Sequence, residues 1–253
     1  MSWRVKFYVW SVALLGLVPL SFYLPQLSPT HISLVLIAAI LAFLADIFEV
    51  EIVPRRSITI SDVIFCSILF IAGPSAMIAS VLGGTLPAEI VLRWHRFRQD
   101  PSYFFSRVAF NTSQILLSSW AAIIIFQLLG GHPPPYNSVL EVVPLALSYV
   151  VFTTTNIVLV SGILHFTQRI QFSKLVTFSI RNLPFQVMAI GIIAILVAVV
   201  YAQAPWQTLL VLIPAVGVHI TLRGYTKLRR EAQRTIETMV KMLHERDPYT
   251  AEH

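Results

Sequence analysis

The sequence is poor in cysteine and in charged residues. One of its 253 residues is a cysteine, Cys66, and it lies within an apolar run, which excludes both a disulfide framework and a cysteine-based metal site. Charged residues make up 12% of the chain, whereas an ordinary soluble domain carries about a quarter. Hydrophobic residues make up 56%. This composition is typical of a protein that crosses a membrane several times.

The sequence also lacks a single cluster of basic residues. The formal net charge of +6 would suit a nucleic-acid partner if the basic residues gathered on one soluble face. They occur instead in short segments between apolar runs, so we exclude nucleic acid as a partner and expect the lipid bilayer instead.

Eight apolar runs approach the length of roughly 20 residues that a helix needs to cross the hydrocarbon core. They run from Phe7 to Leu24, His31 to Phe48, Ile58 to Ala72, Ser75 to Leu92, Val108 to Leu129, Val139 to Phe166, Leu183 to Tyr201 and Trp206 to Leu222. No small-residue cleavage site follows the first run, so we interpret it as a retained span. The sequence therefore predicts an all-α, polytopic transmembrane helix bundle over residues 1–222.

The distribution of cations predicts the orientation of the spans. All 18 Lys and Arg residues fall in segments that lie on one side of this layout, and the segments on the other side, 25–30, 73–74, 130–138 and 202–205, hold none. Because Lys and Arg in short loops stay in the cytoplasm, we expect both termini to be cytoplasmic. We expect the protein in the bacterial cytoplasmic (inner) membrane.

The third run is the weak point of the layout. Ile58 to Ala72 is about 22 Å long as a helix at 1.5 Å per residue, and only Gly73 and Pro74 separate it from the fourth run. A re-entrant hairpin would leave six full spans with the same orientation. We favour eight spans and keep the second layout open.

Three carboxylates lie at the predicted cytoplasmic ends of spans two to four: Asp46, Asp62 and Glu89. The arginines that flank them in the sequence are Arg55, Arg56 and Arg93. The simpler interpretation is ion pairing at the membrane interface. The alternative, a proton or cation site, requires the carboxylates to converge at mid-depth.

Spans five to seven carry the densest polar groups within the apolar runs. Such side chains usually form hydrogen bonds between helices, and the alternative is a pocket for a small ligand. The candidate ligand-binding residues are Asn111, Gln114, Thr154, Asn156 and Gln186.

Residues 223–246 differ from the spans in being highly charged. Apolar or small residues recur at spacings of three and four, at Tyr225, Leu228, Ala232, Ile236, Met239 and Leu243, which predicts one apolar stripe on a helix. The helix could lie along anionic headgroups, or it could be a signalling stalk that pairs with a second copy. The spacing alone leaves both open.

The last residues, Leu243 to His253, resemble the entry to HD-GYP domains, the bacterial phosphodiesterases that hydrolyse cyclic di-GMP. The string Arg-Asp-Pro-Tyr-Thr, then two residues, then His carries the resemblance. Asp247 before Pro248 is also a physically sound helix start. By this resemblance residues 247–253 begin an output domain cut short here, His253 corresponds to its first metal-ligand histidine, and Tyr249 stands where some members have an acidic ligand, which suggests a two-metal centre.

The resemblance implies a membrane-associated sensor region ahead of an HD-GYP output domain. We expect residues 1–222 to detect an unknown small-molecule or membrane stimulus, and residues 223–246 to pass it on, as a homodimer, to the phosphodiesterase. No cofactor is expected in this chain; an iron or manganese type metal pair and cyclic di-GMP would bind only the complete output domain. The main alternative is a small-molecule transporter or its substrate-binding membrane subunit. A lipid-modifying enzyme that uses Asp46, Asp62 or Glu89 is a weaker one.

Overall fold

The computed structural model describes residues 2–48, 50–53, 56–58, 60–168, 170–186 and 191–208, and scattered residues between 210 and 242. It describes side chains for all of these except 50–53, 56–58 and 182–186. The helices are α1 (Trp3–Tyr23), α2 (Ile32–Ile47), α3 (Ser61–Ala72), α4 (Pro74–Phe97), α5 (Pro101–Leu128), α6 (Val143–Gln168), α7 (Phe172–Gln186) and α8 (Ile192–Gln203). Single 3-10 turns occupy Leu24–Gln26, Pro29–His31, Val139–Val142 and Pro205–Gln207.

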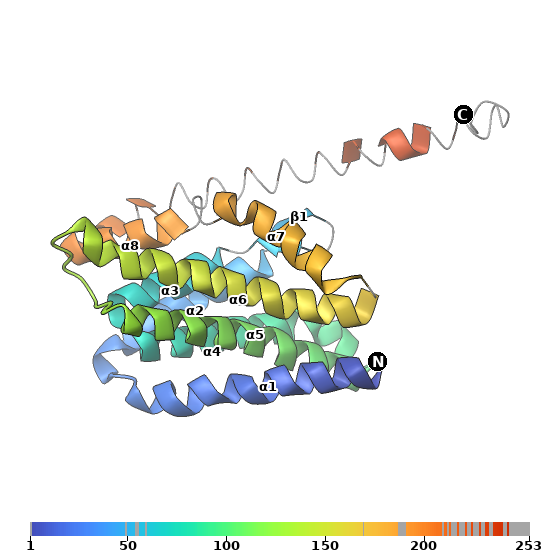
Figure 1. Ribbon diagram of the computed structural model, residues 1–253, viewed down its shortest axis with the longest axis horizontal. Helices are drawn as coiled ribbons and strands as arrows, with labels where there is room; N and C mark the ends of the chain where they lie inside the picture. Colours follow the sequence, from blue (N-terminus) through green and yellow to red (C-terminus); the bar gives the residue numbers. More distant parts are fainter. Residues whose placement is uncertain are drawn as a thin grey trace.

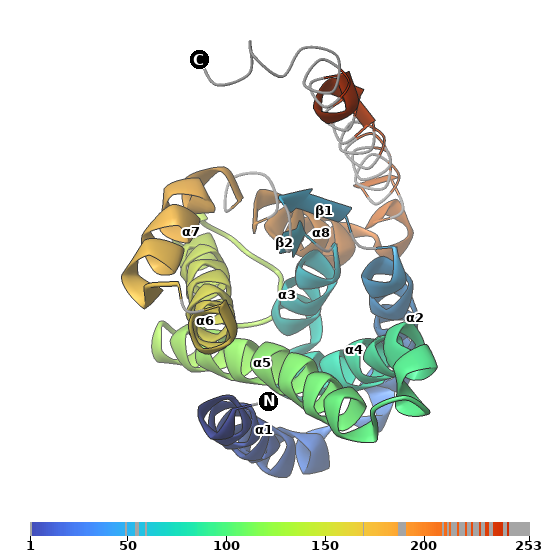
Figure 2. The same cartoon turned by 90° about the vertical axis from the view of Figure 1, so that its right-hand side faces the viewer.

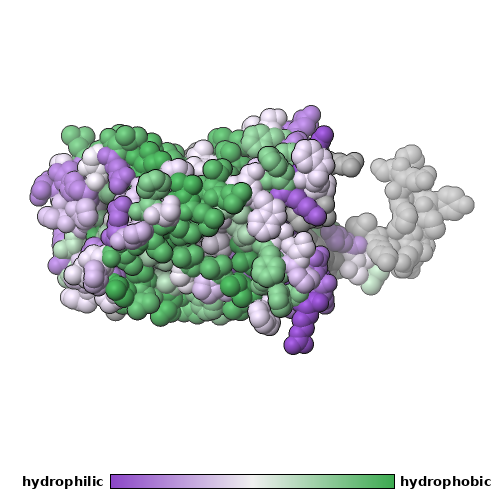
Figure 3. Space-filling view, turned by 90° about the horizontal axis from the view of Figure 1, so that it is seen from below, coloured by the Kyte–Doolittle hydropathy of each residue, from purple (hydrophilic) through white to green (hydrophobic). Residues whose placement is uncertain are grey.

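Among the described residues, five helices are long and apolar enough to cross a membrane. With their adjoining 3-10 turns they cover Trp3–Gln26, Pro29–Ile47, Pro74–Phe97, Pro101–Leu128 and Val139–Gln168. They correspond to the first, second, fourth, fifth and sixth predicted spans. Figure 3 shows hydrophobic residues gathered in a band between two more hydrophilic ends of the molecule. The length and composition of these helices therefore confirm the prediction of a helical, multi-pass membrane protein.

The long helices run side by side along the length of the bundle (Figure 1). Helix α4 packs on α2 and α5, and α5 packs on α1 and α6. Two of these helices extend beyond their apolar runs, α4 to Phe97 and α5 back to Pro101. Asp100 explains the start of α5, because its carboxylate accepts a hydrogen bond from the Tyr103 backbone N–H at 3.0 Å and Pro101 occupies the first helical position.

Helix α3 is short and central. Its 12 residues make it about 18 Å long, and 11 of them are buried. In Figure 2, looking along the bundle, α3 lies inside the ring formed by α2, α4, α5, α6 and α8. The chain reverses after α3 at Gly73, whose φ of 85° suits a residue without a Cβ.

A small β-hairpin precedes α3, and the sequence analysis did not predict it. Strand β1 (Val50–Val53) pairs antiparallel with β2 (Arg56–Ile58), with Val50 opposite Ile58 and Glu51 opposite Ser57. The predicted third span was wrong in its first residues, because Ile58 belongs to β2 and the helix begins at Ser61. β-Branched residues in this stretch suit a strand as well as an apolar span.

The predicted seventh span corresponds to parts of two helices. Helix α7 ends at Gln186 and the 12-residue α8 begins at Ile192, whereas the prediction joined Leu183 to Tyr201. Helix α8 packs on α3, and the Ser67 hydroxyl donates a hydrogen bond to the Ala194 carbonyl at 3.2 Å. The predicted eighth span, Trp206 to Leu222, lies largely outside the described residues.

Candidate functional site

A polar contact links α4 and α5 inside the bundle. Glu89 forms an ion pair with Arg93, one turn later on α4. The Asn111 side-chain amide, on α5, donates a hydrogen bond to the same carboxylate oxygen at 2.8 Å. The exposed fractions of the Glu89 and Arg93 side chains are 13% and 23%. The predicted pairing of Glu89 with Arg93 is confirmed, and Asn111 binds across helices as polar residues within membranes usually do.

Two further carboxylates lie within electrostatic range of this contact. Asp46 on α2 interacts electrostatically with both Glu89 and Asp62. Three adjacent helices thus direct one carboxylate each toward the same region. We call Asp46, Asp62 and Glu89 the carboxylate cluster. Of the arginines predicted to pair with it, Arg55 and the Arg56 side chain lie outside the described part of the chain.

Asp62 is the second residue of α3 and is buried, with an exposed fraction of 8%. Eight residues further along, the Phe70 carbonyl accepts a hydrogen bond from the Tyr136 hydroxyl, in the loop between α5 and α6, at 3.3 Å. Eight residues of helix span about 12 Å, so Asp62 lies about that far along α3 from this contact. The predicted position of Asp62 near the cytoplasmic interface stays a prediction.

Tyr149 extends the buried polar region to α6, and the sequence analysis missed it. The side chain is fully buried, and it lies within electrostatic range of Asp62 and Cys66. Among the described residues its hydroxyl has no hydrogen-bond partner. Cys66 is buried in the same core. A tyrosine in an apolar run gives no sequence signal that distinguishes it from ordinary packing.

The candidate ligand residues fall into different environments. The Thr154 hydroxyl donates to the Val150 carbonyl of its own helix at 2.8 Å. Gln114 Oε1 and Asn156 Oδ1 are buried and have no hydrogen-bond partner in the described structure. The Gln186 side chain and all of His253 lie outside the described residues. Asn111 already donates a hydrogen bond to Glu89. For all five candidate residues, ligand binding stays a prediction.

The residues that the structure describes contain no group of three or more His, Cys, Asp or Glu side chains arranged to hold a metal ion. Of the carboxylate cluster, Asp62 is buried, and Asp46 and Glu89 are partly buried.

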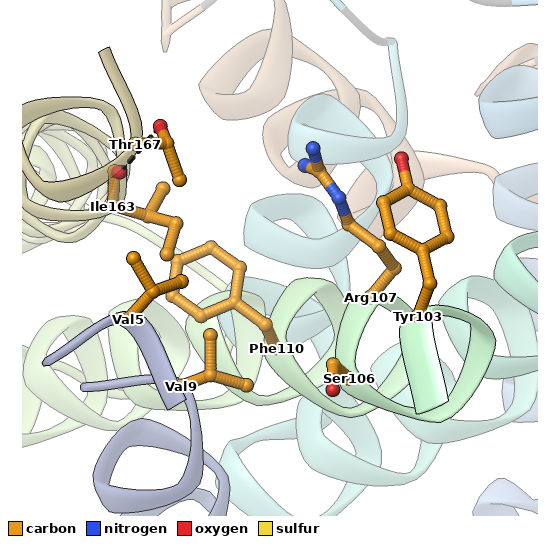
Figure 4. A pocket seen from close by; sticks show the side chains of 8 residues that line it. All are labelled: Val5, Val9, Tyr103, Ser106, Arg107, Phe110, Ile163 and Thr167. Atoms are coloured by element: carbon orange, nitrogen blue, oxygen red, sulfur yellow. Dashed lines mark hydrogen bonds between the residues drawn. The ribbon is translucent and has the colours of Figure 1, made fainter. Parts of the chain in front are cut away.

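A separate groove lies between α1, α5 and α6, at the end of the bundle near the N-terminus (Figure 4). Its volume is about 120 Å³. The lining residues are Val5, Val9, Tyr103, Ser106, Arg107, Phe110, Ile163 and Thr167. None of the five candidate ligand residues is among them. From the sequence, Arg107 was used only to predict the orientation of the spans.

These features define a multi-pass α-helical membrane protein with a partly buried carboxylate cluster. Comparison with protein-family models, with curated proteins and with solved structures found no significant match for this chain.

Proposed function

We propose that this chain is a membrane sensor region that regulates a C-terminal HD-GYP phosphodiesterase acting on cyclic di-GMP. The membrane bundle would detect the stimulus, and the helix after the last span would carry the change to the output domain. The Arg-Asp-Pro-Tyr-Thr-Ala-Glu-His string at residues 246–253 supports the choice of output domain.

One structural observation carries the signalling part of the proposal. The described residues of the linker are helical at Leu228, Ala232, 235–239 and Met242. Leu228, Ile236 and Met239, three members of the predicted stripe, have exposed fractions of 67%, 61% and 58%. Residues 235–239 lie away from the helix bundle (Figure 1). An apolar stripe left uncovered in one chain favours pairing with the same stripe of a second copy.

For the topology we propose eight crossings with cytoplasmic termini, two of them broken. The third crossing would consist of the β-hairpin (β1 and β2) and α3, and the seventh crossing of α7 and α8. The hydrogen bond from Tyr136 to Phe70 supports this layout over a re-entrant hairpin, because it joins the end of α3 to the loop between two full-length helices. Irregular backbone at membrane depth is tolerated where protein surrounds it.

The mechanism we propose is a shift between two packing arrangements of the short helices. Helix α8 contacts α3 and α6 and leads, through residues 205–222, toward the linker. A stimulus that favours one arrangement would rotate or displace the paired linkers and bias the phosphodiesterase between two states.

Cysteine cross-linking in native membranes tests the pairing of the linker. In a Cys66→Ala background, we expect Ile236→Cys and Met239→Cys to form disulfide-linked dimers several-fold faster than Glu237→Cys. Glu237 is the matched control because it lies on the opposite side of the helix. Equal rates at the three positions, or no dimer at any of them, would count against the signalling stalk.

A second experiment tests the output domain. In the protein encoded by the whole reading frame, His253→Ala should abolish cyclic di-GMP hydrolysis while the protein stays folded and membrane-bound, because a two-metal centre cannot lose a ligand without losing the geometry that activates water. Unchanged hydrolysis, or a reading frame without a catalytic module, would refute this part.

The alternative function is a small-molecule transporter, and the burial of Asp62 within the helix bundle favours it. Buried carboxylates within membrane segments often bind protons or coupling ions. Proton-driven solute uptake by vesicles that contain the chain, lost in Asp62→Asn, would support the transporter. Wild-type vesicles that take up no solute, with cross-linked linkers in the same membranes, would support the sensor.

A further inference from the structure

The groove between α1, α5 and α6 has a charged rim. The Arg107 guanidinium lies over the Tyr103 ring, with 5.3 Å between the guanidinium carbon and the ring centroid. Figure 4 shows both side chains pointing the same way, away from the apolar residues below. No carboxylate among the described residues forms an ion pair with Arg107. The guanidinium therefore keeps its hydrogen-bond donors for another partner.

The floor of the groove is apolar and built by three helices. Val5 and Val9 of α1, Phe110 of α5 and Ile163 of α6 line it, and their exposed fractions lie between 3% and 8%. The Ser106 and Thr167 hydroxyls already donate to carbonyls of their own helices, at 2.7 and 2.8 Å. The groove thus offers hydrocarbon contact at its base and cationic donors at its rim.

The rim lies at a membrane interface. Trp94, Phe97, Phe104 and Phe105, at the junction of α4 and α5, form a chain of ring contacts with centroids 5.1 to 6.4 Å apart. Trp94 is 61% exposed. Exposed aromatic rings of this kind gather where headgroups meet hydrocarbon. Arg107 follows Phe105 by two residues on α5, so we expect its guanidinium to lie near the same interface.

The charges around the groove have one predominant sign. Arg4 and Lys6 occupy the first turns of α1, next to Val5, and both are exposed. The nearest acidic residue on α5 is Asp100, whose carboxylate caps the helix through the Tyr103 backbone. These two helix ends thus carry three cations, of which Arg107 lines the groove.

We propose that this groove binds an anionic phospholipid of the cytoplasmic leaflet. The Arg107 guanidinium and the Tyr103 hydroxyl would donate hydrogen bonds to the phosphate, since guanidinium matches the oxygens of a phosphate well. One acyl chain would lie on Val5, Val9, Phe110 and Ile163. The bound lipid would join α1 to α5 and α6 at their cytoplasmic ends.

Native mass spectrometry of the full chain, released from detergent micelles with added lipid, tests the site. We expect the wild type to bind phosphatidylglycerol in preference to phosphatidylethanolamine, because both carry a phosphate but only phosphatidylglycerol has a net negative charge. Arg107→Gln should reduce that preference about tenfold, since it removes the cation that attracts this net charge. The matched control is Arg98→Gln, which removes an equally exposed cation at the end of α4 but outside the groove. It should leave the preference unchanged.

Two further arms separate the headgroup from the acyl chain. Val5→Phe, which fills the floor and keeps every charge, should weaken binding of both lipids. Inorganic phosphate should not displace bound phosphatidylglycerol. The proposal is overturned if Arg107→Gln keeps the preference, if Arg98→Gln loses it equally, or if phosphate displaces the lipid. The assay measures no phosphodiesterase activity, so its result is independent of the proposed output domain.

Discussion

Helices α2 and α4 approach each other closely at Gly84, and this contact gives the sharpest prediction. A Cβ added at Gly84 would lie 2.7 Å from the Ala42 Cβ, 3.1 Å from the Ala39 carbonyl oxygen and 3.4 Å from the Phe43 backbone nitrogen. Ala42 is fully buried. None of these atoms is the end of a flexible side chain, so Gly84→Ala must move one helix away from the other.

The size of the effect follows from two opposing contributions. Relief of the contact requires the Cβ pair to separate from 2.7 Å to the 3.4 Å at which ordinary van der Waals contact begins. Overpacking of this kind costs about 1–3 kcal/mol, and replacing a helical glycine by alanine returns up to about 1 kcal/mol. We therefore expect Gly84→Ala to lower the free energy of unfolding by about 1–2 kcal/mol.

Unfolding by SDS in mixed micelles, followed by tryptophan fluorescence, measures this loss. Gly217→Ala is the matched control, because no atom lies within 4 Å of its added Cβ, and it should be neutral or slightly stabilising. The double variant Gly84→Ala with Ala42→Gly should recover part of the loss, since it removes the shortest contact. A Gly84→Ala protein as stable as the wild type, or a double variant less stable than either single variant, would refute the close packing of α2 on α4.

Two further predictions concern helix contacts elsewhere in the bundle. Gly16→Ala places a Cβ 2.5 Å from the Ser113 Cβ, so it should lower the thermal unfolding midpoint. Ser113→Gly in the same protein should restore part of that loss. An unchanged midpoint in Gly16→Ala would contradict the close approach of α1 to α5. Asn111→Ala removes the amide that donates to Glu89 and should reduce stability by about 1–2 kcal/mol, with a larger loss for Asn111→Asp, which sets a second carboxylate beside the first; a stable Asn111→Asp protein in the SDS assay would contradict this arrangement.

The long spans could be predicted from the sequence because length and hydropathy decide them. A run of about 20 apolar residues has few alternatives to a membrane helix, and the predicted fifth span, Val108 to Leu129, overlaps α5 over most of its length. Its true start at Pro101 depends on the Asp100 cap, which lies outside the apolar run. The short helices could not be predicted in the same way, because the run from Ile58 to Ala72 has the same hydropathy whether it begins as strand or as helix.

The polar contacts between helices could be predicted from the sequence only in part. Asn111 was identified because an amide within an apolar run needs a hydrogen-bond partner, but its partner, Glu89, lies 22 residues earlier on another helix. The convergence of Asp46, Asp62 and Glu89 depends on where α3 begins, and the β-hairpin that precedes α3 determines that position. Tyr149 carries no signal in one sequence, since a tyrosine among apolar residues usually only packs.

The two short helices are the elements best placed to change their packing. Helix α3 packs on α2, α4 and α8, and α8 packs mainly on α3. Neither is long enough to be held by both membrane interfaces. A Cβ on Gly191, at the start of α8, would lie 2.7 Å from the Tyr149 ring, so α8 sits directly against the side chain that reaches the electrostatic range of Asp62. Any change in charge or hydration at the carboxylate cluster therefore acts on the contact that positions α8. Because the chain after α8 leads to the linker, the proposed sensor function would use this contact to convert a stimulus in the membrane into movement of the linker.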